Sequence, residues 1–598
     1  MCVLLFLVLF SPSFALEVAL IPSTGCYSHD VMMKEVGLSM PCGTTITWIQ
    51  TFLYDFGFGE IPLPTNWTRM SIWGHDKEGV ELMHTAGRLL WEQNVPTDFD
   101  RPWDLRGSFI FFKMLERHQT FCEKMLDDQR FLKYMKSQKA DIVLLDHFLQ
   151  ECMGGLAYLL NTSVVQYSNW PIADGYITSL NVPANPSAIP KTGTPYSGLG
   201  MSFDERFGNV LFHWVIIAAR YIQSYVLKRM FARKGFPDVN IIQSEAVRTI
   251  YAGRSEFLFD VVRPINNRVK YFGSSNQKNP SDYVTFIPEK DWNNGTLSCS
   301  HSGNNSQHNF RHLNNPVWKP PTLTERFCSS AVIEVADAQF PKISLRRKNL
   351  YKRLNRNVVK DRFNVITAQF PELDWPSLVK EKFILVSFGS VAQAHNMPLH
   401  LVQKIFFAFS RSPYKVIWQT NSVAESLVWI RNESVPKNVV MINWAPIKEM
   451  LAHPNLQYLI CHGGINTINE LLLFGVPVIG VHLQGDQGSN LRRLADLGVA
   501  VMISIAQISR GELFQTMRKF EANLERHWQR VDQLSSMIET YRTLNNAQQR
   551  FWIGWVAKHG KMLRSRNLFR MYYIGDTENL FWGTVGTILI GLLALVLH

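Results

Sequence analysis

Six short apolar stretches recur between residues 382 and 504, and the segments between them fit helices. Strands and helices that alternate at this spacing form βαβ units, in which each helix leads to the next parallel strand. The pattern therefore predicts a doubly wound α/β domain around a parallel sheet in the C-terminal half of the chain. The predicted strands lie at residues 382–388, 415–420, 439–443, 457–461, 476–481 and 499–504.

A glycine turn and a helix follow the fourth of these stretches. The turn is His462-Gly463-Gly464, and the helix predicted to begin at Asn466 stops at Gly475. The first backbone N–H groups of a helix are unpaired and carry partial positive charge, so they can hold an anion without a metal ion. A strand, a glycine turn and a helix in this order predict a binding site for a phosphate group, to which His462 can add a donor.

Other side chains around this turn could contact a nucleotide and a sugar. Asn466 and Glu470 share one helix face, so the amide can reach a phosphate while the carboxylate accepts hydrogen bonds from ribose hydroxyls. Trp444 could offer its flat face to a base, and Asp486 and Gln487 could bind sugar hydroxyls. Alone, a tryptophan at a strand end usually belongs to the core, and an Asp-Gln pair usually lies in a solvated loop. Only the combination indicates a nucleotide-sugar site.

The order of these residues resembles the signature of the UDP-glycosyltransferase family, of the glucuronosyltransferase type. The family signature consists of W-x-P-Q, H-G-G-x-N-S-x-x-E and D-Q-x-x-N. The chain has WAPI at 444–447, HGGINTINE at 462–470 and DQGSN at 486–490. Ile447 replaces the glutamine, which concerns a contact with ribose or base. Thr467 replaces the serine and keeps a hydroxyl.

The resemblance implies the GT-B architecture, in which two facing Rossmann-like, doubly wound domains enclose the active cleft, here with a C-terminal transmembrane helix. The C-terminal domain is expected to bind a UDP-sugar, and the N-terminal domain a small lipophilic acceptor. Gln419 stands where the family often has a basic residue after tryptophan. The implied donor-binding residues are Ser390, Trp444, His462, Gly463, Gly464, Asn466, Thr467, Glu470, Asp486 and Gln487, with no metal ion and no cofactor.

Two strand patterns in the N-terminal half, at residues 17–22 and 140–145, lead to polar residues. The first runs into a turn that ends in a Ser-His pair with His29, and the second ends at Asp146. At the carboxyl ends of parallel strands these two side chains could meet in a ligand crevice. From spacing alone, such a histidine is more often a loop residue, and such an aspartate can cap the next helix. The family carries its catalytic histidine and partner aspartate at the matching positions, which predicts His29 as general base and Asp146 as its orienting partner.

Both ends of the chain are apolar. Residues 1–15 end in Ser-Phe-Ala, which is typical of a secretory signal peptide, although no basic residue precedes them and a buried first strand is the alternative. Residues 580–598 carry no charged side chain and, as a helix, extend about 28 Å, just enough to cross a bilayer. A tail cleaved for a lipid anchor is the alternative there. The ends predict a single-pass type I protein of the endoplasmic reticulum membrane with its catalytic part in the lumen. Asparagines in N-x-S/T sequences, at 66, 161, 294, 304 and 432, fit glycosylation there.

The positive charge is concentrated in one segment. The net charge is +12, and residues 342–362, with nine basic residues and one acid, supply +8 of it. They belong to a stretch, about 277–363, that is rich in Asn, Ser and His and interrupts the resemblance. A disordered, solvated insert is the better interpretation. Basic clusters also occur in nucleic-acid-binding proteins, but a chain that enters the secretory pathway does not meet chromatin, so no nucleic-acid partner is predicted.

Three further patterns are interpreted as structural features rather than as functional sites. The aspartates 98 and 100 have the spacing of metal ligands in the other large glycosyltransferase architecture, but they lie in a proline-flanked loop, and the helix N-terminus already supplies diphosphate binding. The apolar stretch 207–227 is interrupted by polar residues at helical spacing, which indicates a packing helix rather than a membrane span. Seven scattered cysteines remain without the signal peptide, which is no disulfide scaffold but allows one or two bridges.

The sequence thus predicts a membrane-anchored UDP-glycosyltransferase, with a role such as detoxification. It would transfer glucuronic acid or a hexose to a hydroxyl or amine of the acceptor, with inversion. The alternatives are a UDP-glucose-specific glucosyltransferase and a non-catalytic binding protein of the same fold, and a homo-oligomer is left open. The predicted parts are a signal peptide (1–15), an acceptor-binding domain (16–275), a basic insert or linker (276–370), a UDP-sugar-binding domain (371–560), a juxtamembrane segment (561–579) and a transmembrane helix (580–598).

Overall fold

The structure is a computed structural model of the whole chain. It describes residues 16–53, 60–74, 77–159, 162–169, 179–180, 182–246, 248, 250–287, 354–432, 434–564, 583, 585 and 586. Three predicted parts therefore lie outside the described residues: the signal peptide, most of the basic insert, and the transmembrane helix apart from its three described residues. The juxtamembrane segment also lies outside them from residue 565 onward.

A parallel sheet of seven strands forms the centre of the N-terminal half, in the order β3-β2-β1-β4-β5-β6-β7. β1 and β4 are neighbours, with Leu20 opposite Leu144 and Ile21 opposite Leu145. The strand order reverses between these two strands, and in open α/β sheets ligands bind outside the carboxyl ends of the strands at such a point. The strands are β1 (Glu17–Ile21), β2 (Thr45–Phe52), β3 (Thr68–Trp73), β4 (Ile142–Asp146), β5 (Ser163–Ser168), β6 (Ile250–Gly253) and β7 (Val269–Tyr271).

Helices cover both faces of this sheet because successive strand residues point to opposite sides. In β1, Ala19 and Ile21 belong to one core cluster, whereas Val18 and Leu20 belong to the other. The first cluster is shared with α4, α5, α6, α8 and α9, and the second with α2. The helices are α2 (Tyr27–Leu38), α3 (Lys77–Leu89), α4 (Arg106–Asp127), α5 (Gln129–Ser137), α6 (Glu151–Leu159), α8 (Phe203–Arg233) and α9 (Ile241–Ala246).

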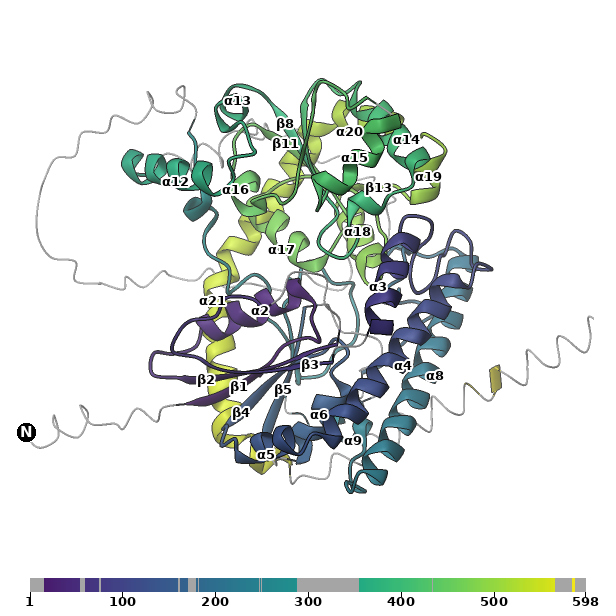
Figure 1. Cartoon of the computed structure of the whole chain (residues 1–598), viewed down its shortest axis with the longest axis vertical. Helices are drawn as coiled ribbons and strands as arrows, with labels where there is room; N and C mark the ends of the chain where they lie inside the picture. The colour runs from purple at the N-terminus through teal and green to yellow at the C-terminus, as the bar shows by residue number, and fades with distance from the viewer. Residues whose placement is uncertain are drawn as a thin grey trace, which may run out of the picture.

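A second parallel sheet, of six strands in the order β10-β9-β8-β11-β12-β13, forms the centre of the C-terminal half (Figure 1). All of its strands lie within one residue or two of the predicted stretches, so the predicted doubly wound sheet is confirmed. The strands are β8 (Phe383–Ser387), β9 (Lys415–Gln419), β10 (Val439–Ile442), β11 (Leu456–Cys461), β12 (Val478–Gly480) and β13 (Ala500–Met502). The helices of this domain are α13 (Trp375–Lys380), α14 (Leu399–Phe409), α15 (Val423–Asn432), α16 (Ile447–Leu451), α17 (Ile465–Phe474), α18 (Gln487–Asp496), α19 (Ile505–Ser509) and α20 (Leu513–Ala522).

One long helix, α21 (Leu524–Arg564), runs along both domains (Figure 1). Near its start, Val531 and Leu534 belong to the core of the C-terminal domain. Further along, Ile553 and Val556 are buried with strand residues of the N-terminal sheet. The helix that the sequence assigns to the donor domain therefore completes the core of the acceptor domain as well.

α8 is the one helix, among the described residues, that is long and apolar enough to cross a membrane. The sequence predicts a packing helix here, and its polar residues lie inside the protein. Arg220 is buried and forms ion pairs with Glu151, at 2.8 Å, and with Glu245. Leu227 and Phe231 belong to the N-terminal core. Arg220 and these two apolar residues thus hold α8 against the sheet domain.

The two ends of the predicted insert are ordered. A short 3₁₀ helix, η1 (Pro280–Tyr283), is followed by Val284 and Ile287, which are buried in the C-terminal core. After the gap, α12 (Arg356–Gln369) begins at its cap Asn355 and buries Val359 and Ile366 in the same core. The Nη1 of Arg362 donates to the carbonyl oxygen of Ser281 at 2.6 Å, so the two ends lie together.

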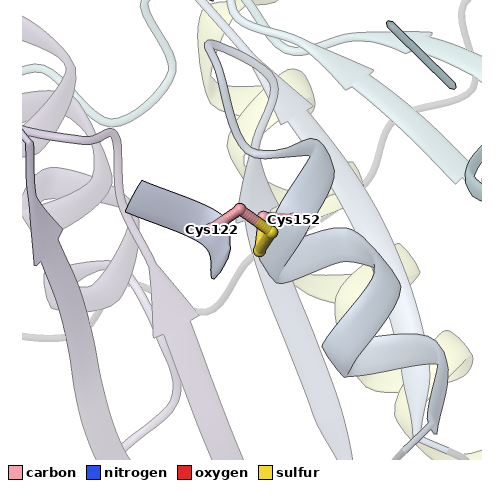
Figure 2. The surroundings of a disulfide bond; sticks show 2 residues. All are labelled: Cys122 and Cys152. Atoms are coloured by element: carbon pink, nitrogen blue, oxygen red, sulfur yellow. A yellow bond between two sulfur atoms is a disulfide. The ribbon is translucent and has the colours of Figure 1, made fainter. Parts of the chain in front are cut away.

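A disulfide bond joins Cys122 of α4 to Cys152 of α6, with their Cα atoms 5.8 Å apart (Figure 2). Both residues are fully buried in the N-terminal core. The sequence allows one or two bridges without naming the pair. Among the described residues, Cys26, Cys42 and Cys461 are free thiols.

Candidate active site

β1 and β4 bring His29 and Asp146 together at the carboxyl edge of the N-terminal sheet. His29 lies in the first turn of α2, where its backbone N–H donates to the carbonyl of Cys26 at 2.9 Å. Asp146 is the last residue of β4. The Nδ1 of His29 lies 3.1 Å from both carboxylate oxygens of Asp146. The backbone N–H of Phe148 also donates to Asp146, at 2.8 Å, and fixes the carboxylate.

The burial of this pair shifts both pKa values. Burial alone would lower the pKa of His29, but the charge and hydrogen bond of Asp146 outweigh it and raise that pKa. Burial alone would raise the pKa of Asp146, but His29 holds it below its usual value. Asp146 is 0 % exposed and His29 8 % exposed. The pair is thus a carboxylate and an imidazole whose proton affinity is increased, as a general base requires.

Asp30, the neighbour of His29, is a second buried carboxyl group at the site. It accepts hydrogen bonds from the hydroxyl of Ser23 at 2.9 Å and from the amide of Gln50 at 2.5 Å. Burial raises the pKa of Asp30 to about 7. Nothing in the sequence analysis singled it out. A signal was present, because a second ionisable residue directly follows the Ser-His pair.

His147, the residue after Asp146, also lies at this edge. Its Nδ1 is 3.9 Å from a carboxylate oxygen of Asp146, and its ring centroid is 5.7 Å from that of His29. Burial lowers the pKa of His147 to about 3, so the ring is neutral at physiological pH. The sequence analysis missed it, because a histidine directly after a buried strand matches no part of the family signature.

The glycine turn of the C-terminal domain has the predicted geometry. β11 ends at Cys461, and α17 begins at Ile465. Its N-cap residue is Gly464, which has no side chain to cap the first N–H groups of the helix. Gly463 has a φ of 87°, a conformation that favours glycine. The ring of His462 leaves no room for a Cβ at Gly464, where such an atom would lie 2.6 Å from Nε2. Burial lowers the pKa of His462 to about 4, so the ring is neutral at physiological pH.

Asn466 connects this helix to the N-terminal domain. Its amide Nδ2 donates to the backbone carbonyl of Ser28 at 2.7 Å, and its Oδ1 accepts from Arg254 at 3.0 Å. Ser28 directly precedes His29 in the chain. The first turn of α17 therefore lies beside the residue predicted as the base, with Thr467 half-buried in the same turn. The amide predicted for a phosphate is bound to the opposite domain in this conformation.

Glu470 also has partners between the domains. Its Oε1 lies 3.7 Å from the Nζ of Lys448, which is 3.0 Å from Glu35 of α2. Arg254 forms an ion pair with the same Glu35. Burial raises the pKa of Glu470, and Lys448 opposes that rise only in part. A ribose hydroxyl would therefore have to share Glu470 with Lys448, a residue that the sequence analysis did not consider.

Four residues that the sequence analysis discussed lie around the donor-side loops. The ring of Trp444 meets that of Tyr27 edge to face, with centroids 6.0 Å apart. Gln419 accepts from the backbone N–H of Ala445 at 3.1 Å, so this departure from the family pattern holds the Trp444 loop against β9. Ile447 opens α16 and packs against the core of the domain. Ser390 lies in the turn after β8 and is half-buried.

Asp486 and Gln487 lie where the chain enters α18. The carboxylate of Asp486 accepts from the amide of Asn490 at 2.6 Å, and the same amide donates to the carbonyl of Gly463 at 3.0 Å. Burial raises the pKa of Asp486 to about 6, and its charge acts on His29 of the other domain. The amide oxygen of Gln487 accepts from the backbone of Leu483 and Gln484, each at 3.0 Å, and so holds its own loop.

A separate hollow of about 600 Å³ lies beside α18 and α19. Arg101, Arg492 and Arg510 line it, but each forms an ion pair with an acidic residue close in sequence. Asp100 also lines it, whereas Asp98 pairs with Arg101. None of the predicted site residues lines the hollow, so it is not the candidate active site.

Comparison with known proteins gives a coherent set of relatives. Residues 378–573 match the model of the UDP-glucoronosyl and UDP-glucosyl transferase family. Over 174 residues, 29% of this chain and 32% of the relative, the chain is 30% identical to human UDP-glucuronosyltransferase 3A1. Over 186 residues, 31% and 32% of the two chains, it is 28% identical to mouse 2-hydroxyacylsphingosine 1-beta-galactosyltransferase. These matches span about a third of each relative.

Solved structures with a similar arrangement include the glycotransferase of kitacinnamycin, with a TM-score of 0.48 and 14% identity over 91% of this chain and 98% of the other. A UDP-glucosyltransferase from Polygonum tinctorium has the same TM-score and 12% identity over 92% and 99%.

Proposed function

Because residues 378–573 match the model of the UDP-glucoronosyl and UDP-glucosyl transferase family, we propose that the protein transfers glucuronic acid or a hexose from a UDP-sugar to a hydroxyl or amine of a small lipophilic acceptor. The observation that carries the proposal is the hydrogen bond from Asn466 to Ser28. It places the N-terminus of α17, where a diphosphate would bind, one residue away from His29. A leaving-group site and a base on opposite sides of one cleft are the two parts that a sugar transfer requires.

His29 removes the proton of the acceptor in this mechanism. An alcohol is a poor nucleophile near neutral pH, so its proton has to leave as the bond to the anomeric carbon forms. Asp146 holds the Nδ1–H of His29, which leaves Nε2 to accept that proton. The carboxylate then stabilises the imidazolium that develops. Asp146 is therefore a positioning residue, and His29 is the catalytic residue.

The UDP leaving group departs as an anion, so no general acid has to protonate it. The unpaired N–H groups at the start of α17 and the neutral ring of His462 can hold the diphosphate. Asp486 binds hydroxyls of the sugar. Attack by the acceptor on the face opposite to UDP is a single displacement, which inverts the configuration at the anomeric carbon.

The ribose of UDP binds to Glu470 in this proposal, and this requires a change at the domain interface. Lys448 has to give up part of its contact with Glu470, but it keeps Glu35 as a partner. Arg254 likewise keeps Glu35 when Asn466 turns to a phosphate. Glu35 can therefore retain both cations while the donor enters.

We also propose the location that the sequence predicts: a type I protein of the endoplasmic reticulum membrane with the described domains in the lumen. The glycosylation sequence at Asn66 lies on the exposed surface, which supports this location. A buried disulfide bond, which persists in oxidising compartments, supports it as well. Protease digestion of sealed microsomes tests the topology, because cleavage near Arg346 without detergent would place this segment on the cytosolic side.

The activity is tested by incubating the full chain with UDP-glucuronic acid, UDP-glucose or UDP-galactose and a mixture of phenols and sterols. We expect UDP release with one donor and a glycosylated acceptor in the mass spectrum. Two variants test the site: Glu470→Ala should weaken binding of UDP itself, whereas Asp486→Ala should spare UDP and impair the reaction. If no donor leads to release of UDP, the non-catalytic binding protein is favoured instead.

A further inference from the structure

Three potential metal ligands meet at the carboxyl edge of the N-terminal sheet. We propose that His29, Asp146 and His147 form a binding site for a divalent transition-metal ion such as Zn²⁺, and that the bound ion blocks His29. Binding of the ion stands on the geometry alone. Only its inhibitory effect rests on the proposed glycosyl transfer.

The spacing of the ligand atoms fits a small coordination site. The Nδ1 of His29 is 3.1 Å from Asp146, and the Nδ1 of His147 is 3.9 Å from it. One ligand atom from each of the three residues lies within 4.8 Å of the other two. In a tetrahedral zinc site with bonds of about 2.0–2.2 Å, ligand atoms lie about 3.3–3.6 Å apart. The spacing of 3.1 Å lies just below this range and that of 3.9 Å just above it. A shift of the side chains by roughly 1 Å would bring all three ligand atoms to the spacing of a zinc site.

The chemistry of the three donors selects the kind of ion. Two imidazole nitrogens and one carboxylate oxygen suit zinc and its neighbours in the first transition row. Mg²⁺ and Ca²⁺ prefer sites made of oxygen atoms. Three protein ligands leave a fourth position for water, as in other accessible zinc sites. All three side chains are buried, and the carboxylate of Asp146 is the ligand that offsets part of the charge of the ion.

The ion would inhibit by changing which nitrogen of His29 carries the proton. In the neutral ring, the proton on Nδ1 is donated to Asp146, and Nε2 is free to act as the base. When Nδ1 binds the metal, its N–H bond breaks and the proton is transferred through water to Nε2. The ring keeps one proton, and no electron is gained or lost. With a proton on Nε2 and a metal on Nδ1, His29 has no lone pair left for the acceptor proton.

Substitution of His147 allows metal binding to be tested separately from catalysis. It is the one of the three ligands that has no part in the proposed transfer, in which His29 and Asp146 suffice. Loss of His147 is therefore expected to weaken metal binding and to leave transfer in metal-free buffer unchanged. The exposed His84 provides a matched control, because it offers an imidazole far from this sheet edge in sequence.

Isothermal titration of the metal-free full chain with Zn²⁺ tests the binding. We expect one high-affinity ion per chain, and none with Mg²⁺ under the same conditions. His147→Asn should raise the Kd for Zn²⁺ by at least about 10- to 100-fold, the loss that outer partners of a metal site alone can cause. His84→Asn should leave the Kd unchanged. Equal Zn²⁺ affinity of wild type and His147→Asn, or no binding by wild type, would overturn the proposal.

Transfer assays test the inhibition separately. Zn²⁺ should inhibit wild type, a chelator should restore its activity, and the inhibitory concentration should rise for His147→Asn in parallel with its Kd. High-affinity binding without inhibition would retain the metal site and refute its contact with Nδ1 of His29. If His147→Asn does not fold, X-ray absorption of the wild-type zinc complex decides, since a zinc ion without two imidazole ligands contradicts the site. Absence of transfer with every donor would refute the proposed function but leave the titration valid.

Discussion

The Nδ1 of His29 is bound by Asp146, and the proposed role of His29 rests on this contact. Nδ1 is held by a carboxylate that is itself fixed by a backbone N–H. A proton on Nδ1 leaves Nε2 as the basic nitrogen. The buried carboxyl group of Asp30 beside it adds negative charge without contacting Nδ1. A side chain at position 29 that cannot accept a proton would keep the fold, but the site would lose its base.

We therefore expect His29→Ala to lower kcat by at least about 10² to 10⁴-fold, the usual contribution of a positioned base. Asp146→Asn should lose somewhat less, because the base remains and only its orientation changes. The affinity for UDP, measured by calorimetry, should stay nearly unchanged in both variants. A His29→Ala protein with wild-type turnover on a phenol would contradict the assignment and direct attention to Ser28 or another residue of the cleft.

Asp486 makes donor binding depend on pH. Burial raises its pKa to about 6, so the group is an ionised acceptor for sugar hydroxyls above pH 6 and loses its charge as the pH falls. The Kd for the UDP-sugar should therefore rise as the pH falls from 7 to 5, approaching tenfold per unit at the acidic end. Titration calorimetry at several pH values measures this. For Asp486→Asn the Kd for the UDP-sugar should be higher and nearly independent of pH. An identical pH profile for both proteins would exclude Asp486 as the cause of the pH dependence.

At this scale the sequence predicts residues but not their neighbours. His29 and Asp146 were found because the family pattern names them, and the structure brings them together at the edge of the sheet; their catalytic role stays a prediction. Lys448 and Arg254 could not be found, because their contacts join segments far apart in the chain. Ion pairs between domains leave no periodic signal in a sequence.

At the scale of elements, the disulfide bond joins α4 and α6 on one face of the N-terminal sheet (Figure 2). Of the two helices, α6 contacts β4, whose last residue is Asp146. The bond closes a loop with a sequence separation of 30. It restricts the unfolded chain more than the folded one, so its main effect is expected on stability rather than on the geometry of the site.

We expect Cys122→Ala together with Cys152→Ala to lower the free energy of unfolding by about 3 to 4 kcal/mol, the chain-entropy value for a loop of this length. Alanine is chosen because a serine hydroxyl would be buried without a known partner. Urea denaturation followed by circular dichroism measures the change. Cys42→Ala is the control, since this thiol is exposed and free, and an equal loss in that variant would rule out the disulfide as the cause.

Elements differ in how well the sequence predicts them. The strands β8 to β13 were predictable because each is a short apolar run between polar turns. The destination of α21 was not, because helical periodicity tells which face is buried but not against which domain. The ends of the insert were missed for a related reason: the apolar run that holds Val284 and Ile287 is short, and only the folded core shows that these residues are buried.

At the scale of the whole molecule, the two domains share one continuous set of contacts. Residues of the N-terminal half, among them Trp91 and Phe259, belong to the large core of the C-terminal domain. The indole of Trp91 donates to the carbonyl of Gln393 at 3.1 Å. The backbone of Val95 pairs with that of Leu483 and Gly485. Cuts in the chain should therefore be tolerated only where they leave these contacts intact.

Replacing residues 288–353 by a short Gly/Ser linker should leave the affinity for UDP within severalfold of wild type. The segment joins ends that already lie together, and loop length changes the closure free energy by only about 0.6 kcal/mol per doubling. Calorimetry with UDP and thermal unfolding measure the outcome. A longer deletion of 276–370 is the comparison, because it removes Val284, Ile287 and α12 and should unfold at a lower temperature. If the shorter deletion is unfolded, the segment is part of the core.

α21 also determines how substrates can enter. At 1.5 Å per residue its 41 residues extend about 60 Å, along both domains. The hydroxyl of Ser535 donates to the carbonyl of Leu473 in the C-terminal domain at 2.7 Å, and that of Tyr167 in the N-terminal domain donates to Gln549 at 2.9 Å, so the helix is attached to both domains. A continuous helix resists bending, and the domains can separate only by turning about an axis close to it. A rotation that separates the domains would have to break the backbone hydrogen bonds that join Val95 to Leu483 and Gly485.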